Sequence, residues 1–455
     1  MPTAYTILFL LLILVAAATW IIPAGSYDYV DGVPVAGTYH TVEQNPQGVG
    51  DVLKAAFSGF YDAVDVCIFI LMVGGFLGVV MKTGAVDAGV GNVIRLLGGR
   101  EKWLIPILML LFGLGGTTYG MWEETMAFYP LLIPVFLAAG YDAVVGISVI
   151  LLGAGAGVIA STVNPFATGI AAGFAGVSLG EGIVLRLLEW VAFEAAAIWF
   201  VMAYAAKVKK NPSKSVVGVG AGKIQVSMDQ QVSFTAKRKV IMVLFTLTFL
   251  IMVYAVVPFD EMGLSLPALG WWFPELSALF LVAGVVIGLI DRMSEEELVE
   301  TYVAGCADLL GVAFIIGISR GITVLMNDGA ITDTVLHWGE QALSGAGAIS
   351  FTLLVFALYL PLTILIPSSS GLATLSIPIV APLGKFAGVG GDLVVTAFQS
   401  ASGLVNIITP TAAVVMGALA LGHVPYDRWV KYVWKLILWF LLLALAFLVA
   451  GVLLG

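Results

Sequence analysis

Long apolar stretches alternate with short polar segments along the whole chain. A helix needs roughly 20 predominantly apolar residues to cross a bilayer. By this criterion we expect spanning helices near residues 4–22, 63–82, 143–175, 183–206, 240–258, 275–291, 306–326, 391–422 and 430–454. Of the 455 residues, 60% are hydrophobic and only 11% are charged, whereas a soluble domain carries about 25% charged residues. The pattern predicts an all-α polytopic membrane protein.

Two further apolar regions, residues 103–139 and 350–384, are each divided by a polar tip. Their arms, of about 14 to 17 residues, are too short to cross a bilayer. We expect each region to form a re-entrant hairpin, which enters the membrane and returns to the same side. Two short amphipathic segments, residues 51–61 and 294–305, each precede a span, and we expect both to lie in the plane of the interface.

Two of the expected spans have a polar interruption that contains a proline. Residues 161–169 interrupt the span at 143–175, and residues 400–411 interrupt the span at 391–422. Proline cannot complete the helical hydrogen-bond ladder, so both helices should be broken there. Opened backbone at membrane depth is tolerated only where protein buries it or where it lines a cavity. One such break in each half of a chain is typical of a transporter's binding site.

Several landmarks recur at a nearly constant offset. Met81 has its counterpart at Met326, and Pro165 has its counterpart at Pro410, in both cases 245 positions later. The chain therefore divides into a first repeat at residues 1–206, a basic cytoplasmic linker with an unpaired helix at residues 207–259, and a second repeat at residues 260–455. Because the unpaired helix reverses the direction of the second copy, we expect an inverted-repeat transporter with two re-entrant hairpins and two broken helices.

The distribution of charge predicts the orientation. Residues 207–239 carry eight Lys or Arg side chains against the single acid Asp229, so this loop should be cytoplasmic. Residues 24–50 carry three acids and no Lys or Arg, so that loop should be external. We expect a multi-pass protein of the inner membrane of a prokaryote, with its N-terminus in the cytoplasm and its C-terminus outside. The net charge of -9 offers no basic face for a nucleic acid.

The first hairpin tip contains the adjacent acids Glu123 and Glu124. Ionisable groups at membrane depth are costly and are candidates for function, and a bound proton or a cationic substrate would offset their repulsion. Arg320, inside the expected span at 306–326, should hold a carboxylate, either that of a substrate or that of one of these acids; the alternative is that it extends to the outer surface.

The hydroxyl and amide groups of the tips and breaks complete the candidate site. The candidate substrate-binding residues are Thr117, Thr118, Glu123, Glu124, Asn164, Arg320, Ser368, Ser369, Ser370, Asn406 and Thr409. The candidate sodium ligands are Ser161, Thr162, Asn164, Thr168, Ser402, Asn406 and Thr411. Hydrogen bonding between helices is the alternative role for these side chains.

Residues 115–134, residues 22–27 and the Ser-Arg-Gly sequence around Arg320 resemble the YfcC-like branch of the C4-dicarboxylate anaerobic carrier family, within the ion transporter superfamily. The resemblance implies a scaffold domain, a transport domain with two hairpins, a homodimer and an elevator movement. Relatives carry a sodium-binding Ser-Asn-Thr sequence at the hairpin tips, whereas this chain has Gly-Thr-Thr and Ser-Ser-Ser. Some members look like arginine–ornithine exchangers, and the Glu123-Glu124 pair fits a cationic amino acid better than a dianion.

We therefore expect a secondary active transporter of a small carboxylate-bearing metabolite, either a C4-dicarboxylate or an amino acid. Transport would be coupled to Na⁺, to H⁺ or to exchange, and no other cofactor is expected. An ion channel would need a continuous polar pore, and an intramembrane enzyme would need a nucleophile–base pair or a metal cluster. The sequence shows neither pattern, so we expect no enzymatic activity.

The predicted orientation can be tested by labelling single cysteines introduced at Lys210 and Val35. An impermeant thiol reagent should reach the two positions from opposite sides of the membrane. Labelling of both from the same side would contradict the predicted topology.

Overall fold

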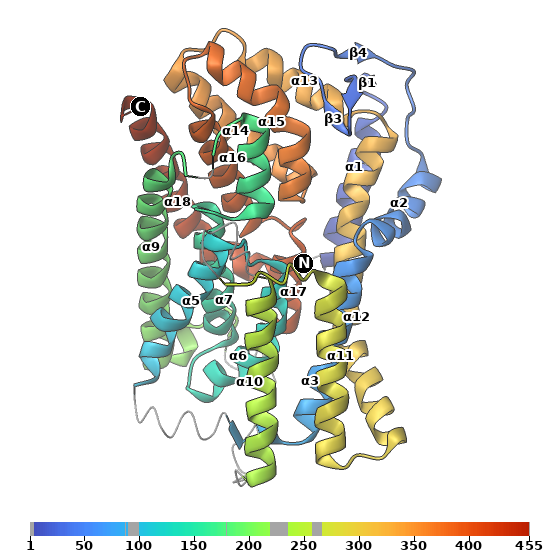
Figure 1. Cartoon of the computed structure of the whole chain (residues 1–455), viewed down its shortest axis with the longest axis vertical. Helices are drawn as coiled ribbons and strands as arrows, with labels where there is room; N and C mark the ends of the chain where they lie inside the picture. The colour runs from blue at the N-terminus through green and yellow to red at the C-terminus, as the bar shows by residue number, and fades with distance from the viewer. Residues whose placement is uncertain are drawn as a thin grey trace.

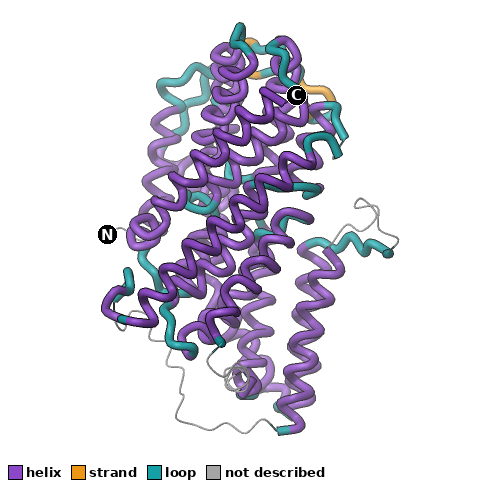
Figure 2. The backbone as a smooth tube through the Cα atoms, turned by 90° about the vertical axis from the view of Figure 1, so that its left-hand side faces the viewer, coloured by secondary structure: helices purple, strands orange, loops and turns teal. Residues whose placement is uncertain are grey.

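The computed structural model describes residues 4–86, 88–89, 100–178, 180–218, 235–256 and 266–454. Helices account for nearly all of the tube in Figure 2, and the strands are confined to one end. Within the described part of the chain, five helices are long and apolar enough to cross a membrane: α3 (Val64–Lys82), α11 (Phe273–Asp291), α12 (Glu295–Asp328), α14 (Ala348–Leu365) and α18 (Tyr426–Leu454).

The remaining elements are, in chain order, α1 (Ala4–Ala18), β1 (Gly25–Ser26), β2 (Tyr29–Val30), β3 (Val33–Pro34), β4 (His40–Thr41), α2 (Val49–Asp62), η1 (Glu101–Trp103), α5 (Leu104–Thr118), η2 (Glu123–Phe128), α6 (Tyr129–Ala138), α7 (Ala143–Ile159), η3 (Pro165–Gly169), α8 (Ile170–Ala175), α9 (Ile183–Lys210), η4 (Pro212–Lys214), α10 (Ala236–Val256), α13 (Thr332–Leu343), α15 (Ser369–Phe386), α16 (Gly391–Asn406) and α17 (Ala413–Leu421). The strands form two antiparallel pairs, β1 with β4 and β2 with β3.

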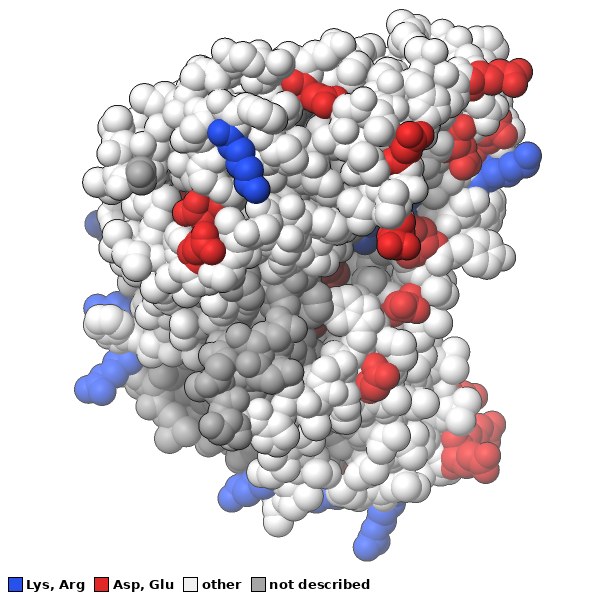
Figure 3. Space-filling model, turned by 45° about the horizontal axis from the view of Figure 1, so that its top comes forward, with Lys and Arg blue, Asp and Glu red and all other residues white. Residues whose placement is uncertain are grey.

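The outer surface is apolar over much of its area. Most of the atoms visible in Figure 3 belong to uncharged residues. Large side chains point outward from the long helices, such as Trp199 on α9, which is 70% exposed, and Trp439 on α18, which is 62% exposed. Exposed apolar surface of this extent on a helical protein suits contact with lipid rather than water.

The described helices pack in two groups. Helices α1, α2, α3, α10, α11 and α12 contact one another, and α3 packs along α12. Helices α5 to α9, α14 to α16 and α18 make the second group, in which α5 packs on α7, and α16 on α7, α14 and α18. Figure 1 shows the first group on the right and at the bottom, and most of the second group on the left and at the top. Helix α17 and the η2 turn lie where the two groups meet.

Helices α3 and α12 approach each other closely at their glycines. A Cβ atom on Gly305 would collide with the carbonyl oxygen of Gly74, and a Cβ on Gly74 would collide with that of Gly305. A Cβ on Gly78 would lie 2.9 Å from Cα of Gly305. Small residues allow such contact between helix backbones, which stabilises packing where lipid supplies no hydrophobic driving force.

The strand-bearing loop is fixed to α13. The backbone N–H of Tyr27 donates to Asp333 Oδ2 at 3.0 Å, and the Tyr27 hydroxyl donates to Glu340 Oε2 at 2.8 Å. The Tyr39 ring stacks on His337 with centroids 4.0 Å apart. Burial, the hydrogen bond to Glu340 and nearby charges raise the pKa of the Tyr27 hydroxyl, so it remains a donor. This loop lies at the top right of Figure 1, at the end of the long axis opposite to the lower ends of α10 and α11.

The structure has the two predicted helix breaks but differs from the sequence expectations elsewhere. Helix α14, one arm of the second expected hairpin, has 18 residues and is long and apolar enough to cross a membrane, whereas the sequence predicts arms that are too short. The amphipathic segment 294–305 is not a separate helix in the plane of the interface. It is the first part of α12, which begins at the Ser294 cap and runs unbroken for 34 residues. The reason is packing, because Tyr302 and Gly305 of this segment contact α3. The Tyr302 hydroxyl also donates a hydrogen bond to Met72 O at 3.0 Å. The boundary of the first helix also differs, since α1 ends at Ala18 rather than near residue 22.

The glycine contact between α3 and α12 leads to a stability prediction. Gly305→Ala should lower the free energy of unfolding by about 1 to 3 kcal/mol, because the added methyl group separates two helix backbones. Thermal melting of the purified protein in detergent measures the effect. Gly50→Ala is the matched control, because a Cβ there meets nothing within 4 Å. Equal melting temperatures of the two variants would contradict the predicted role of the contact.

Candidate functional site

The first break is fastened to the tip of the first hairpin. Helix α7 ends at Ile159, and regular structure resumes only in the π-helical turn η3. Between them, the Thr162 N–H and hydroxyl both donate to Thr117 O, at 2.8 and 2.9 Å. The Thr117 hydroxyl donates to Ala160 O at 2.8 Å. These bonds replace the partners that the interrupted helix cannot supply, and they join α5 to the break.

Asn164 lies against the backbone of the hairpin tip. Its side chain packs so closely on Gly120 that a Cβ atom at this position would collide with it. Such a Cβ would lie only 2.5 Å from Asn164 Nδ2. Gly120 also has a φ of +79°, in the left-handed region that favours glycine. Asn164 Oδ1 accepts a hydrogen bond from the Ala167 N–H at 3.4 Å, so its amide stabilises both the break and the tip.

The second break is held by side chains from other elements. Helix α16 ends at Asn406, and α17 begins at Ala413. Two side chains of α18 donate hydrogen bonds to carbonyls that the break releases. Trp429 donates to Ile407 O at 3.1 Å, and Tyr426 donates to Ile408 O at 2.7 Å. The Ser319 hydroxyl of α12 donates to Thr411 O, and the hydroxyls of Thr409 and Thr411 are 2.8 Å apart.

A small pocket lies where the two halves of the chain meet. Its lining includes Glu123 from the first hairpin, Arg320 from α12, Pro367 from the second hairpin, and Asn406 and Thr411 from the second break. The N-terminal residues of α17 also line it. Its volume is about 30 Å³, which is space for about one water molecule. A larger ligand can enter only if the lining moves.

The charges in this pocket are only loosely paired in the structure. Arg320 Nε lies 3.8 Å from Asp62 Oδ2, and Glu123 faces Arg320 across the pocket. Asn406 Oδ1 is buried and has no hydrogen-bond partner among the described residues. A cation, an anion and an unused acceptor therefore line the same small space.

The other predicted substrate-binding residues lie outside the pocket lining. The Glu124 carboxylate turns back to accept from the Trp122 N–H at 3.1 Å, and the Thr118 hydroxyl donates to Leu114 O of its own helix at 2.6 Å. Ser368 caps α15 by accepting from the Gly371 N–H at 3.2 Å. Ser369 and Ser370 occupy the first turn of α15, with Ser370 Oγ 3.4 Å from Ser368 Oγ. Thr409 is paired with Thr411.

The predicted sodium ligands divide between the two breaks. Ser161 Oγ and Thr168 Oγ1 in the first break, and Ser402 Oγ in α16, are buried and have no hydrogen-bond partner among the described residues. Oxygen atoms of this kind are the donors that hard cations prefer. No group of three or more His, Cys, Asp or Glu side chains in the described chain could hold a metal ion.

The sequence interpretation missed the buried charges of α9. Arg186, Glu189 and Glu194 are 2%, 0% and 2% exposed, respectively. We treated residues 183–206 as an ordinary span. Three ionisable side chains within an apolar helix were the signal that could have identified this cluster.

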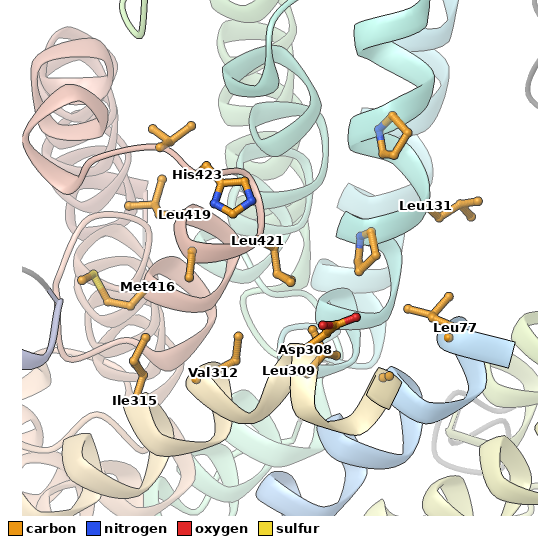
Figure 4. A pocket seen from close by; sticks show the side chains of 18 of the residues that line it. Leu77, Leu131, Asp308, Leu309, Val312, Ile315, Met416, Leu419, Leu421 and His423 are labelled. Atoms are coloured by element: carbon orange, nitrogen blue, oxygen red, sulfur yellow. The ribbon is translucent and has the colours of Figure 1, made fainter. Parts of the chain in front are cut away.

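A large cavity lies beside the small pocket. Its volume is about 1520 Å³, and it lies between α3 and α12 on one side and α6 and α17 on the other. Figure 4 shows the Asp308 carboxylate among the apolar side chains that line it, and His423 across from it. Ile315 and Met416 line the large cavity, and their near neighbours Ile316 and Val414 line the small pocket. The two spaces are therefore adjacent along both α12 and α17.

A family model for C4-dicarboxylate anaerobic carriers matches residues 1–453. The chain belongs to the C4-dicarboxylate anaerobic carrier family. Membership in this family makes the chain a membrane transporter.

Two relatives of this carrier align over nearly its whole length. It is 35% identical to an uncharacterized protein of Haemophilus influenzae, over 99% of this chain and 97% of the relative. It is 30% identical to the putative basic amino acid antiporter YfcC of Escherichia coli, over 95% of this chain and 92% of the relative. Among solved structures, it is similar to the YdaH transporter of Alcanivorax borkumensis, with a TM-score of 0.44 and 14% identity over 98% of each chain.

The amides at the two breaks lead to a second mutational prediction. Asn164→Ala and Asn406→Ala remove little apolar packing, so expression of the carrier should stay near normal. Transport should be lost, because Asn164 holds the tip and Asn406 contributes an acceptor to the pocket. Asn211→Ala is the control, because Asn211 caps the distant η4 turn. Parental uptake by both variants in proteoliposomes would mean that the two amides only join helices.

Proposed function

We propose that this carrier is a secondary active transporter of a small carboxylate-bearing metabolite, and that its substrate is a basic amino acid such as arginine or ornithine. The observation that carries the proposal is that Glu123 and Arg320 line one pocket. A pocket lined by one acidic and one basic side chain suits a ligand that is itself both cation and anion. The Escherichia coli relative is named a putative basic amino acid antiporter, which also supports this choice.

Each lining group has a role in this proposal. Arg320 and the backbone N–H groups at the start of α17 would hold the substrate carboxylate, since a helix N-terminus and a guanidinium both favour anions. Glu123 would hold an ammonium group, and Asn406 Oδ1 would accept one of its hydrogen bonds. Because the pocket is smaller than an amino acid, the hairpin tips must move apart before the substrate binds.

The proposal includes the inverted repeat and its hairpins. In support, helices in corresponding positions of residues 1–206 and 260–455 pack in pairs, namely α3 with α12, α7 with α16, and α9 with α18. The group that contains both expected hairpins would be the transport domain, and the group around α3 and α12 would be the scaffold. Relative movement of the two groups would be the elevator step. The homodimer rests on the family resemblance alone.

The orientation is also part of the proposal. Lys82, Arg428 and Lys431 line the large cavity, and positive side chains favour the cytoplasmic face. The cavity would therefore open to the cytoplasm, with the strand-bearing loop outside. Coupling to Na⁺, to H⁺ or to exchange would supply the driving force.

A C4-dicarboxylate is the second candidate substrate, because it is the substrate named in the description of the family. A dianion would place one carboxylate on Arg320 but would bring the other towards Glu123. Like charges in a site of low dielectric repel strongly. The pocket therefore favours the zwitterion with an additional amine.

Glu123→Gln should weaken arginine binding, because it removes the anionic partner of the ammonium group while keeping the shape of the side chain. Loss of one member of a buried charge pair costs about 2 to 5 kcal/mol, so affinity should fall at least roughly thirtyfold. Arginine and ornithine counterflow in proteoliposomes measures the effect, with succinate as the test of the second candidate.

Glu124→Gln is the matched comparison, because its carboxylate faces its own turn rather than the pocket. The loss of arginine affinity in Glu124→Gln should be clearly smaller than the loss in Glu123→Gln. Equal losses in both variants would contradict the assignment of Glu123 alone to the substrate. Transport of succinate but not of arginine by the parent protein would favour the dicarboxylate.

A further inference from the structure

Two charged side chains of α9 connect the first helix break to α16, the helix that leads to the second break. Arg186 Nη2 donates to Thr162 O in the first break at 3.3 Å. One turn further along, Glu189 Oε1 accepts from the Ser400 hydroxyl of α16 at 2.8 Å, and α16 ends at the second break. Both charged side chains are buried. A change of charge at this place therefore acts on a hydrogen bond at the first break and on one within α16, the helix that leads to the second break.

The second oxygen of Glu189 is unused. Glu189 Oε2 is fully buried and has no hydrogen-bond partner among the described residues. A buried carboxylate oxygen without a donor is costly when it is ionised. A bound proton would remove that cost, and unlike a sodium ion it would need no shell of several oxygen ligands.

The charged groups around Glu189 leave one negative charge uncompensated. Arg186 contributes one positive charge, and Asp392 lies near it, because both side chains pack on Gly182. A Cβ atom on Gly182 would lie 2.9 Å from Asp392 Oδ2 and 3.3 Å from Arg186 Nη1. Glu189 and Asp392 together contribute two negative charges when ionised. One bound monovalent cation therefore makes this cluster neutral.

Among the described residues, the elements packed on this part of α9 supply no titratable group besides Asp392 of α16. Helices α5, α7 and α8 contain no titratable residue. The titratable residues of α18 lie in its first half, between Tyr426 and Lys435. Its later half faces Glu189, as shown by the contact of Phe193 with Phe440. Glu194, further along α9, lies against Gly113 of α5 and has no bond to either break in the described chain.

We propose that Glu189 is a proton-binding site, separate from the substrate pocket, through which a proton gradient drives transport. The inference rests on the proposed transport function. Glu189 takes up a proton from the solution on one side and releases it on the other, and no covalent bond other than the O–H bond forms or breaks. Protonation changes the Ser400 bond and leaves Arg186 with Asp392 as its carboxylate partner. Binding or release of the proton therefore acts on the first break and on α16 at the same time.

A direct test is infrared difference spectroscopy of the reconstituted carrier during a pH titration. The carbonyl stretch of a protonated carboxylic acid should titrate in the parent protein and in Glu194→Gln, and this band should be missing in Glu189→Gln. Ser400→Ala keeps the carboxyl group but removes its hydrogen bond, so it should shift the midpoint of the titration. This variant tests the site even if Glu189→Gln fails to fold. A titrating band unchanged in both Glu189→Gln and Ser400→Ala would overturn the assignment.

A second test uses labelled arginine uptake into proteoliposomes with an imposed pH gradient. The gradient should drive accumulation in the parent and in Glu194→Gln, and accumulation in Glu189→Gln should fall to the level seen without a gradient. Accumulation driven by a sodium gradient instead, and lost in Glu189→Gln, would overturn the proton in favour of sodium. Gradient-driven accumulation in Glu189→Gln would also overturn the proposal. Absence of arginine transport together with a Glu189-dependent band would contradict the substrate proposal but support the proton site.

Discussion

The structure depends on one constraint, namely that backbone groups released from a helix inside a membrane need partners from elsewhere in the protein. At the first break, Thr117 of α5 provides them. At the second break, side chains of α18 and Ser319 of α12 provide them. Ser319 precedes Arg320, and both residues line the pocket. The need for hydrogen bonds therefore joins three helices, α5, α12 and α18, to the two breaks.

Local chemistry explains which features could be predicted from the sequence. Pro165 and Pro410 lie in apolar spans and cannot complete a helical ladder, so the breaks were predictable from single residues. The cost of burying Glu123 and Arg320 marked both as candidates for function, and the structure brings both to one pocket. In these cases the physical cause lies in the residue itself.

Features that depend on tertiary contacts could not be predicted. Glu123 and Glu124 are adjacent and chemically alike, yet the turn η2 sends only the first into the pocket. The segment 294–305 has the composition of an interfacial helix, but its packing on α3 makes it part of α12. Thr118 lies beside Thr117 but bonds back to its own helix. Neighbours in sequence point to different faces, and only the packed structure determines which face matters.

The fastening of the strand-bearing loop to α13 has a mechanical consequence. At that end of the molecule, Tyr27 ties the loop to Asp333 and Glu340, and the Gly25 N–H bonds to Ala330 O, just beyond the end of α12. At the other end, the two helix groups are separated by the large cavity. The contacts between the loop and α13 therefore restrain one end of the molecule, whereas fewer contacts hold the two groups together around the cavity.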